Sequence, residues 1–173
     1  DAVKEITVRR GLARCLLDEA RIFTCGNAGS AIHAQHLAVK LLGRLERERP
    51  GLPVFCLGDN APLLSTLADH FGAHDVHARQ VRALGQPGDV LVAIAAGNIP
   101  PATLQAIIAA HDRDMDVIVF SGRDNDELGH ILAESDIEVR ATSSSVLGSE
   151  EVHLLQINLV FDVIERELFG DLT

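Results

Sequence analysis

The residues best suited to chemistry lie in one short turn near the start of the chain, Gly-Asn-Ala-Gly-Ser at positions 26–30. An apolar segment leads into this turn, and a helical pattern follows it directly. Gly26 and Gly29 permit tight or positive-φ backbone and leave space for an approaching ligand. Asn27 and Ser30 supply short polar groups where the next helix presents unpaired N–H donors and the positive end of its dipole. This arrangement predicts a binding site for an anion such as a phosphate.

Alternating strands and helices must position this turn. Short apolar runs predict strands over 21–25, 52–57, 89–95, 116–120 and 136–139, and periodic segments predict helices over 3–20, 31–47, 62–68, 75–84, 100–111, 125–133 and 150–169. This alternation predicts an α/β fold with a parallel, doubly wound sheet. We expect a single domain over 1–173, with an N-terminal helix at 3–20, a sheet core at 21–140 and a closing helix at 150–169.

Length, composition and charge limit the range of functions. The 173 residues suffice for one domain with a substantial core, and no apolar run approaches the length of a membrane span. Residues 1–20 are charged and amphipathic, unlike a signal peptide, so a cytoplasmic protein with no membrane partner is expected. Cys15, Cys25 and Cys56 are predicted to be buried free thiols. A net charge of −10 without Trp, Tyr or a basic tract argues against direct nucleic-acid binding.

Five matches in the same order resemble the sugar isomerase (SIS) domain, and more narrowly its phosphoheptose isomerase branch: 25–30, 34–38 with 43–50, 79–91, 121–124 and 151–155. The resemblance implies a three-layer, flavodoxin-like fold with a five-stranded parallel sheet. It also implies a homotetramer, packed through its N-terminal and C-terminal helices, that binds a sugar phosphate at subunit interfaces. The branch holds two types of protein. One converts sedoheptulose 7-phosphate to a heptose phosphate for lipopolysaccharide precursors; the other, the DnaA initiator-associating protein, is non-catalytic and binds the replication initiator.

Two positions at which the resemblance implies proton transfer carry other residue types. An aldose–ketose isomerase needs a base that moves a proton between adjacent carbons and an acid that serves the oxygen. The family's glutamate after the turn is matched by Lys40, and its histidine on the closing helix is matched by Asn158. A protonated lysine is a poor base, and an amide does not titrate. These replacements predict that no catalytic residue remains and that the isomerase chemistry is lost.

The predicted ligand-binding residues follow the carboxyl ends of strands, where open α/β sheets bind ligands. After strand 89–95, the family's hydroxyl-rich phosphate loop is replaced by Ala-Ala-Gly-Asn-Ile-Pro at 95–100, which leaves backbone N–H groups to receive an anion. The serines at 143–145 either compensate for the lost hydroxyls or form a solvated loop. The predicted set is Asn27, Gly29, Ser30, Asp59, Asn60, Gly97, Asn98 and Glu150.

Some isomerases of this branch bind zinc, and the resemblance leaves His36 as the retained metal ligand, with Glu150 as an oxygen ligand. His33 lies one helical turn from His36, and His153 one turn from Glu150, so a two-helix zinc site is one alternative. The other is a pair of helices with surface or interface histidines, and no cofactor is the expectation. The histidines at 70, 74, 77, 111 and 130 are expected to lie at the surface.

The last candidate residues are those that suit a protein partner. Arg49, next to Pro50, is predicted to be exposed, and Leu168 and Phe169 end the closing helix in a Leu-Phe pair that either docks on its own subunit or meets a partner. We therefore expect a SIS-domain homotetramer that acts as a non-catalytic, DnaA initiator-associating scaffold. Such a scaffold can still bind a sugar phosphate. The alternatives are an active D-sedoheptulose 7-phosphate isomerase and a sensor that binds a sugar phosphate without turnover.

Overall fold

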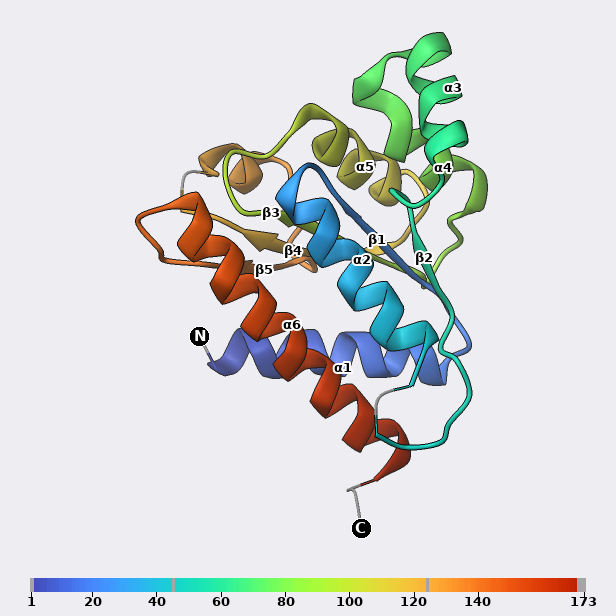
Figure 1. Ribbon diagram of the computed structural model, residues 1–173, viewed down its shortest axis with the longest axis vertical. Coiled ribbons are helices and arrows are strands. Elements are labelled where there is room, and N and C mark those ends of the chain that lie inside the picture. Colours follow the sequence, from blue (N-terminus) through green and yellow to red (C-terminus); the bar gives the residue numbers. More distant parts are fainter. Residues whose placement is uncertain (1, 45, 124, 171–173) are drawn as a thin grey trace.

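A five-stranded parallel sheet forms the centre of the molecule, in a computed structural model that describes residues 2–44, 46–123 and 125–170 (Figure 1). Its strands are β1 (Ile22–Gly26), β2 (Val54–Cys56), β3 (Val90–Ala95), β4 (Asp116–Ser121) and β5 (Ile137–Arg140). They lie in the order β2-β1-β3-β4-β5, and every neighbouring pair is parallel. The predicted α/β fold with five parallel strands is confirmed.

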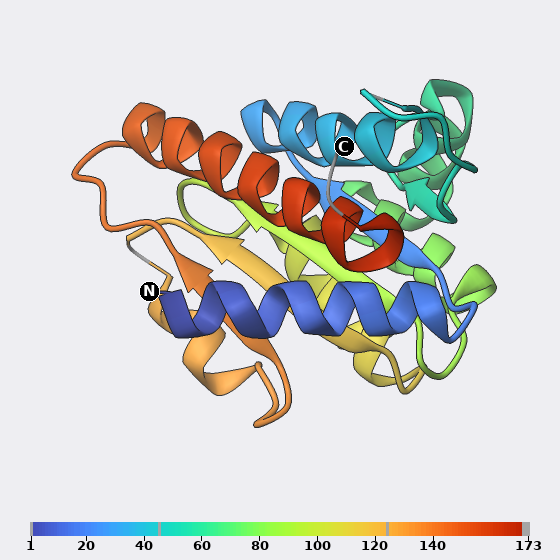
Figure 2. The ribbon, with the colours of Figure 1, turned by 90° about the horizontal axis from the view of Figure 1, so that it is seen from below.

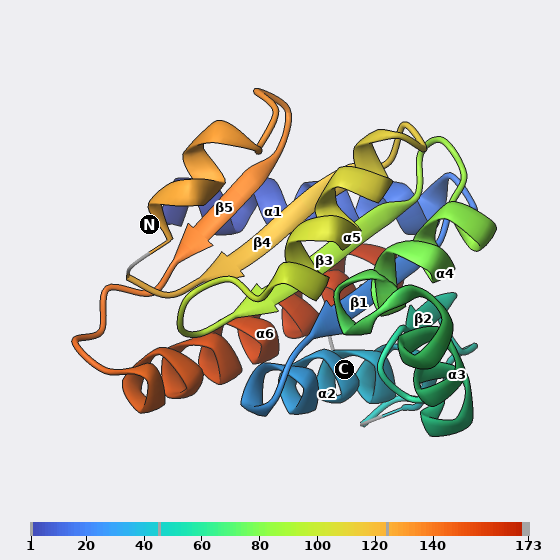
Figure 3. The same ribbon diagram turned by 90° about the horizontal axis from the view of Figure 1, so that it is seen from above.

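Helices cover both faces of this sheet (Figures 2 and 3). They are α1 (Ala2–Leu17), α2 (Gly29–Leu42), α3 (Ala61–Phe71), α4 (Val76–Leu84), α5 (Pro101–His111) and α6 (Val146–Phe169), with the short 3-10 helices η1 (Ala73–Asp75) and η2 (Asp126–His130). Successive strand residues point to opposite faces. Ile22 and Val92 therefore join the core under α1, α2 and α6, whereas Phe23 and Leu91 join the core under α4 and α5. Two cores on one sheet make the three layers of a doubly wound fold.

The strand order places the turn after β1 at a crevice. From β1 the chain moves outward to β2 and then crosses to β3 on the other side of β1, so the direction of winding reverses between β1 and β3. In the parallel register, Gly26 at the end of β1 lies opposite Ile94 near the end of β3. Ligands of open α/β sheets bind at such a reversal, outside the carboxyl ends of the strands.

Several helix boundaries differ from those predicted, and three of the differences lie near the site. The helix α2 ends at Leu42 rather than at position 47, where the N–H of Gly43 closes the last turn on Val39 O. The helix α6 begins at Val146, four residues earlier than predicted, because the hydroxyl of Ser145 caps it by accepting from Gly148 N at 3.0 Å. The segment predicted as a helix over 125–133 forms only the 3-10 helix η2.

The cysteines lie largely where they were predicted to lie. Cys15 and Cys25 are buried free thiols, and burial raises the pKa of each to about 12. Cys56 is a half-buried free thiol whose pKa burial also raises. No helix among the described residues is long and apolar enough to cross a membrane.

Candidate functional site

The turn after β1 is tied to its neighbours by buried polar contacts. A Cβ on Gly26 would lie 2.6 Å from Ser30 O, so only glycine fits where the strand meets the helix. The Ser30 hydroxyl accepts from Ala96 N at 3.1 Å, and Asn27 Oδ1 accepts from the Thr103 hydroxyl at 3.0 Å. Two predicted ligand residues thus hold the turn against the loop after β3 and against α5, which makes them part of the frame of the site.

The left-handed backbone in this turn belongs to an alanine, which corrects the expectation that a glycine adopts it. Ala28 has φ 51° and ψ −124°, whereas neither Gly26 nor Gly29 has a positive φ. A Cβ on Gly29 would lie 2.1 Å from Glu150 Oε1, so any larger residue there would displace the end of the Glu150 side chain. The carboxylate of Glu150, on the first turns of α6, therefore lies directly against the backbone of the turn.

Replacing Ala28 with glycine is expected to raise the free energy of unfolding by about 1 kcal/mol. The substitution relieves about 1–2 kcal/mol of left-handed strain and costs part of that in backbone entropy of the unfolded chain. Urea unfolding followed by circular dichroism measures the difference. Gly88, which also has a positive φ and has open space at its Cβ, offers the reverse control, since Gly88→Ala should destabilise the chain. A destabilised Ala28→Gly variant would contradict this account.

The loop after β3 is held by Asn125, which is not among the predicted site residues. Asn125, 2% exposed, accepts from Ile99 N at 2.6 Å through Oδ1 and donates to Gly97 O at 2.7 Å through Nδ2. A Cβ on Gly122 would lie 2.0 Å from Ala96 O, so the loops after β3 and β4 touch through their backbones. The predicted residues Gly97 and Asn98 line a cavity here together with the serines at 143–145. The Ser-Gly-x-x-Asn spacing after β4 was the available signal for Asn125.

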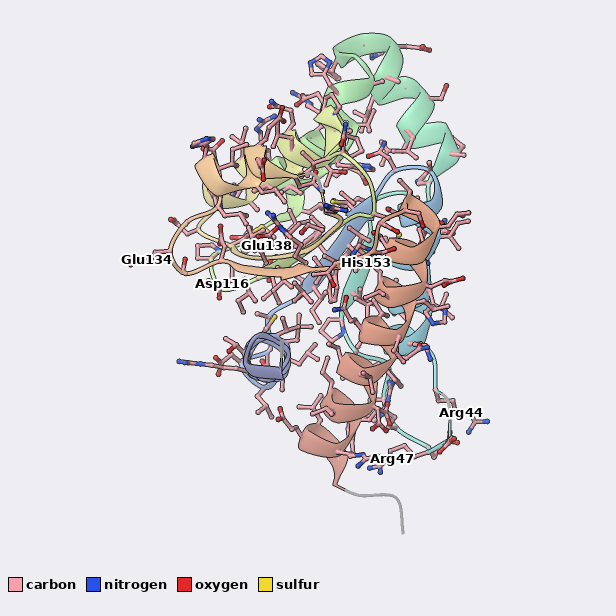
Figure 4. All side chains as sticks on the ribbon, turned by 90° about the vertical axis from the view of Figure 1, so that its left-hand side faces the viewer. Arg44, Arg47, Asp116, Glu134, Glu138 and His153 are labelled. Atoms are coloured by element: carbon pink, nitrogen blue, oxygen red, sulfur yellow. The ribbon has the colours of Figure 1, made fainter. Side chains whose placement is uncertain are left out.

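A row of polar side chains lies between α2 and α6, on the face of the sheet that these helices share with α1. His36 Nε2 lies 3.0 Å from Asn158 Oδ1, which joins the two helices. His153, 0% exposed, donates through Nε2 to Ser121 O at 3.0 Å, and Figure 4 places its ring on the side of α6 that faces the sheet. We call His33, His36, Glu150, His153 and Asn158 the α2/α6 seam. It brings predicted ligand, metal and catalytic positions together.

Burial controls the protonation of the imidazoles. It lowers the pKa of His33, although the nearby Glu150 carboxylate opposes that shift. It also lowers the pKa of His153, in spite of the carbonyl of Ser121. His77, expected at the surface, is instead 3% exposed beneath the ends of β1 and β2. Burial lowers its pKa, although hydrogen bonding to the carbonyls of Gly26 and Leu57 opposes that shift. His77 lies inside because the inner face of α4 packs on the sheet.

Stability is therefore expected to fall as the pH drops below about 6.5. In the unfolded chain these histidines have ordinary pKa values, whereas in the folded chain their pKa values are lower, so the unfolded chain binds more protons in that window. The urea concentration at the midpoint of unfolding, measured at about pH 7.5 and about pH 5.5, gives the size of the effect. His77→Phe should flatten the dependence, and the matched surface change His70→Phe should not. A pH-independent midpoint would contradict the burial of neutral rings.

The remaining predicted ligand residues, Asp59 and Asn60, are exposed after β2. Asn60 caps α3, since its Oδ1 accepts from Leu63 N at 3.0 Å. The structure thus shows Asn60 in a structural role, at the start of α3.

The seam does not form a zinc centre. Within the described ranges, no group of three or more His, Cys, Asp or Glu residues is placed to hold a metal ion. The Nε2 atom of His36 is hydrogen-bonded to Asn158 and is therefore not free to bind a metal. Lys40, one helical turn from His36, has its Nζ 5.2 Å from the centre of the Phe161 ring, and its positive charge would repel a cation. The residues present thus do not fit the metal alternative, and no chemical step is assigned to one.

The residues predicted to bind a partner are used within the subunit. Arg49, whose side chain is 1% exposed, pairs with Glu165 of α6 and donates to Lys40 O and Leu41 O at the end of α2. Leu168 and Phe169 are partly buried against the core. The placement of Arg49 at the surface was wrong, because the guanidinium satisfies carbonyls that the end of α2 leaves unpaired.

Comparison with known proteins identifies the family. Residues 7–122 match the SIS domain. The phosphoheptose isomerase of Methylococcus capsulatus is 43% identical over 92% of this chain and 82% of its own length, and that of Chromohalobacter salexigens is 42% identical over 92% and 81%. The structure of a phosphoheptose isomerase from Francisella tularensis superimposes with a TM-score of 0.90 at 30% identity, covering 94% of this chain and 85% of that one.

These relatives overturn the expectation of a non-catalytic scaffold that binds the replication initiator. Four phosphoheptose isomerases are 40–43% identical to the chain over 91–98% of it. The expectation treated Lys40 and Asn158 as the whole of the proton-transfer machinery, whereas the seam also contains three imidazoles and a carboxylate. The chain belongs to the SIS domain family and, within it, to the group of the phosphoheptose isomerases.

Proposed function

We propose that this chain is a phosphoheptose isomerase that interconverts sedoheptulose 7-phosphate and a heptose phosphate. The observation that carries the proposal is the 40–43% identity to phosphoheptose isomerases across more than nine-tenths of the chain. The α2/α6 seam, next to the turn at the carboxyl end of β1, supplies residues of the types that the reaction requires.

The isomerisation moves one proton between C1 and C2 and one proton between the two oxygens, through an enediol. It needs an imidazole or carboxylate with a free lone pair at the carbon. The Oδ1 atom of Asn158 only accepts, so it fixes the proton of His36 on Nε2 and leaves the Nδ1 lone pair available. We assign His36 as the base for the carbon proton and Asn158 as the residue that positions its ring.

Glu150 and His33 are assigned to the oxygens. They interact electrostatically across the seam, and His33 is one helical turn from His36. Burial favours the neutral ring of His33, which has one nitrogen that donates and one that accepts. A neutral imidazole beside a carboxylate suits the exchange of a proton between two hydroxyl oxygens without a net change of charge.

The test is incubation of the purified chain with sedoheptulose 7-phosphate in D₂O, followed by ¹H and ³¹P NMR. We expect a new sugar phosphate that carries deuterium at C2, because the proton removed by His36 exchanges with solvent before its return. Sedoheptulose without the phosphate serves as the control for recognition of the phosphate group. A folded chain that yields neither product nor deuterium exchange would overturn the proposal.

We also propose that the chain forms a homotetramer. Large apolar side chains are exposed on α2 and α6: Ile32, Val39, Leu42, Leu147, Leu154, Leu155 and Leu159. An uncovered apolar face of this kind favours association between identical subunits. Light scattering after size-exclusion chromatography should give four times the mass of one chain, and a monomer mass would contradict the proposal.

A further inference from the structure

His153 is the most deeply buried residue of the α2/α6 seam, and the reaction proposed above assigns it no role. Its ring lies edge-on to the ring of Phe120, with the two ring centres 6.0 Å apart. Its Nε2 atom lies 3.0 Å from Ser121 O at the end of β4. These two contacts, made from the side of α6 that faces the sheet in Figure 4, fix the orientation of the imidazole.

The contacts of His153 also fix the position of its proton. Ser121 O can only accept hydrogen bonds, and it accepts a second one from Ala141 N at 2.8 Å. The ring nitrogen that faces this carbonyl must therefore carry the hydrogen. Because burial lowers the pKa of His153, the ring is neutral at neutral pH, and its Nδ1 atom has a lone pair and no hydrogen.

Two ring nitrogens in the seam are buried without a partner. Neither His153 Nδ1 nor His33 Nδ1 forms a hydrogen bond with any residue that the structure describes. Burial lowers the pKa of His153, and a positive charge on His33 would lower it further, so the two rings lie within electrostatic reach. An unpaired buried nitrogen costs free energy, and such atoms are normally satisfied by another polar group or by an ordered water.

Resting on the function proposed above, we propose that His153 is a positioning residue for His33, linked to it by a water molecule held between the two Nδ1 atoms. His33 donates to this water, and the water donates to the lone pair of His153. The second hydrogen of the water is left for the carboxylate of Glu150, which is near enough to His33 to oppose the lowering of its pKa by burial.

This link determines which nitrogen of His33 meets the sugar. With its hydrogen fixed on Nδ1, the ring has its lone pair on Nε2. Nε2 accepts the proton of one sugar hydroxyl, so that an O–H bond breaks as an N–H bond forms, and it returns the proton to the other oxygen. While His33 is charged, its Nδ1–H remains paired with the water, which strengthens that hydrogen bond.

Ring ¹⁵N NMR of the chain labelled with ¹⁵N-histidine tests the link without substrate, because it shows which nitrogen of each neutral ring carries hydrogen. The chain has eight histidines, whose signals are assigned by comparison with single histidine variants. At about pH 7.5 we expect the hydrogen on Nδ1 in His33 and on Nε2 in His153. A wild-type spectrum in which His33 carries its hydrogen on Nε2 overturns the proposal.

Variants of His153 then test whether it acts through His33. His153→Phe keeps a ring against Phe120 but removes the acceptor, so His33 should lose its preference for hydrogen on Nδ1. For sedoheptulose 7-phosphate, kcat should fall about 10-fold and KM should stay within about 2-fold. His153→Asn places an amide oxygen near the position of Nδ1 and should restore the tautomer of His33 and part of kcat. His77→Phe, a change at a histidine buried outside the seam, is the control and should leave that tautomer unchanged.

The outcomes separate this link from the proposed reaction. If His33 carries hydrogen on Nδ1 and loses that preference in His153→Phe, but the wild-type chain never isomerises the sugar, the link stands and the reaction falls. If a folded His153→Phe variant keeps the wild-type tautomer of His33, the link is wrong whatever the activity. If the tautomer changes and kcat stays at the wild-type value, His153 does not position His33 for the reaction, and the proposal is overturned.

Discussion

Replacing His36 with asparagine is expected to lower kcat/KM for sedoheptulose 7-phosphate by about 100-fold or more. A positioned general base contributes about 10²–10⁴ to the rate of such a reaction, and asparagine has no lone pair of suitable basicity. The same variant should stop the entry of deuterium at C2. Because Arg49 also joins the end of α2 to Glu165 of α6, we expect the helices to remain packed.

Variants of Asn158 test whether the residue acts through His36. Asn158→Asp keeps an acceptor opposite Nε2 and should retain most of kcat, whereas Asn158→Leu removes the acceptor and should lower kcat with little change in KM. His130→Asn, an exposed histidine on η2, is the matched control and should behave like wild type. Full activity of His36→Asn would remove the residue from the mechanism.

Replacing Glu165 with alanine is expected to lower the free energy of unfolding by about 3–5 kcal/mol. Its carboxylate is 12% exposed and pairs with Arg49, and with Arg47 at 3.5 Å. Removal of one partner from a buried ion pair leaves an uncompensated charge, and here it leaves two. Arg47 is held in place by Phe169 O and Gly170 O at the end of α6, near the foot of the molecule in Figure 4, so it does not swing into solvent without breaking further bonds.

Urea unfolding followed by circular dichroism measures this loss. Glu167→Ala, an exposed glutamate on the same helix, is the matched control and should change the free energy of unfolding by less than about 0.5 kcal/mol. A Glu165→Ala variant as stable as the control would mean that the two arginines find other partners.

The strands and the turn after β1 could be predicted because their signals are local. Five apolar runs and the glycines at 26 and 29 indicated the sheet and the position of the turn, and the structure confirms both. The ends of helices were predicted less well, since the cap of α6 is chosen between Ser145 and Ser149 by loop geometry. The burial of His77 depends on which face of α4 meets the sheet, and a single nine-residue helix specifies that face poorly.

The composition of the site could be predicted only where the residues are close in sequence. The pairing of His36 with Asn158 spans 122 positions, and that of Asn125 with the loop after β3 spans 26 and 28. Position-by-position matching to a family assigned Asn158 as a lost acid–base group. It could not assign an amide that orients a neighbouring ring, because that role exists only after the two helices pack.

Contacts at both ends join the two helices that form the α2/α6 seam. At one end Glu150 lies against Gly29, and at the other Arg49 joins the last carbonyls of α2 to Glu165 of α6. These two contacts lie on either side of the seam histidines, so both oppose sliding of one helix along the other. Since a displacement of about 1 Å can cost about 10²-fold in rate, the proposed isomerase activity should depend on Arg49, which is not one of the proposed catalytic residues.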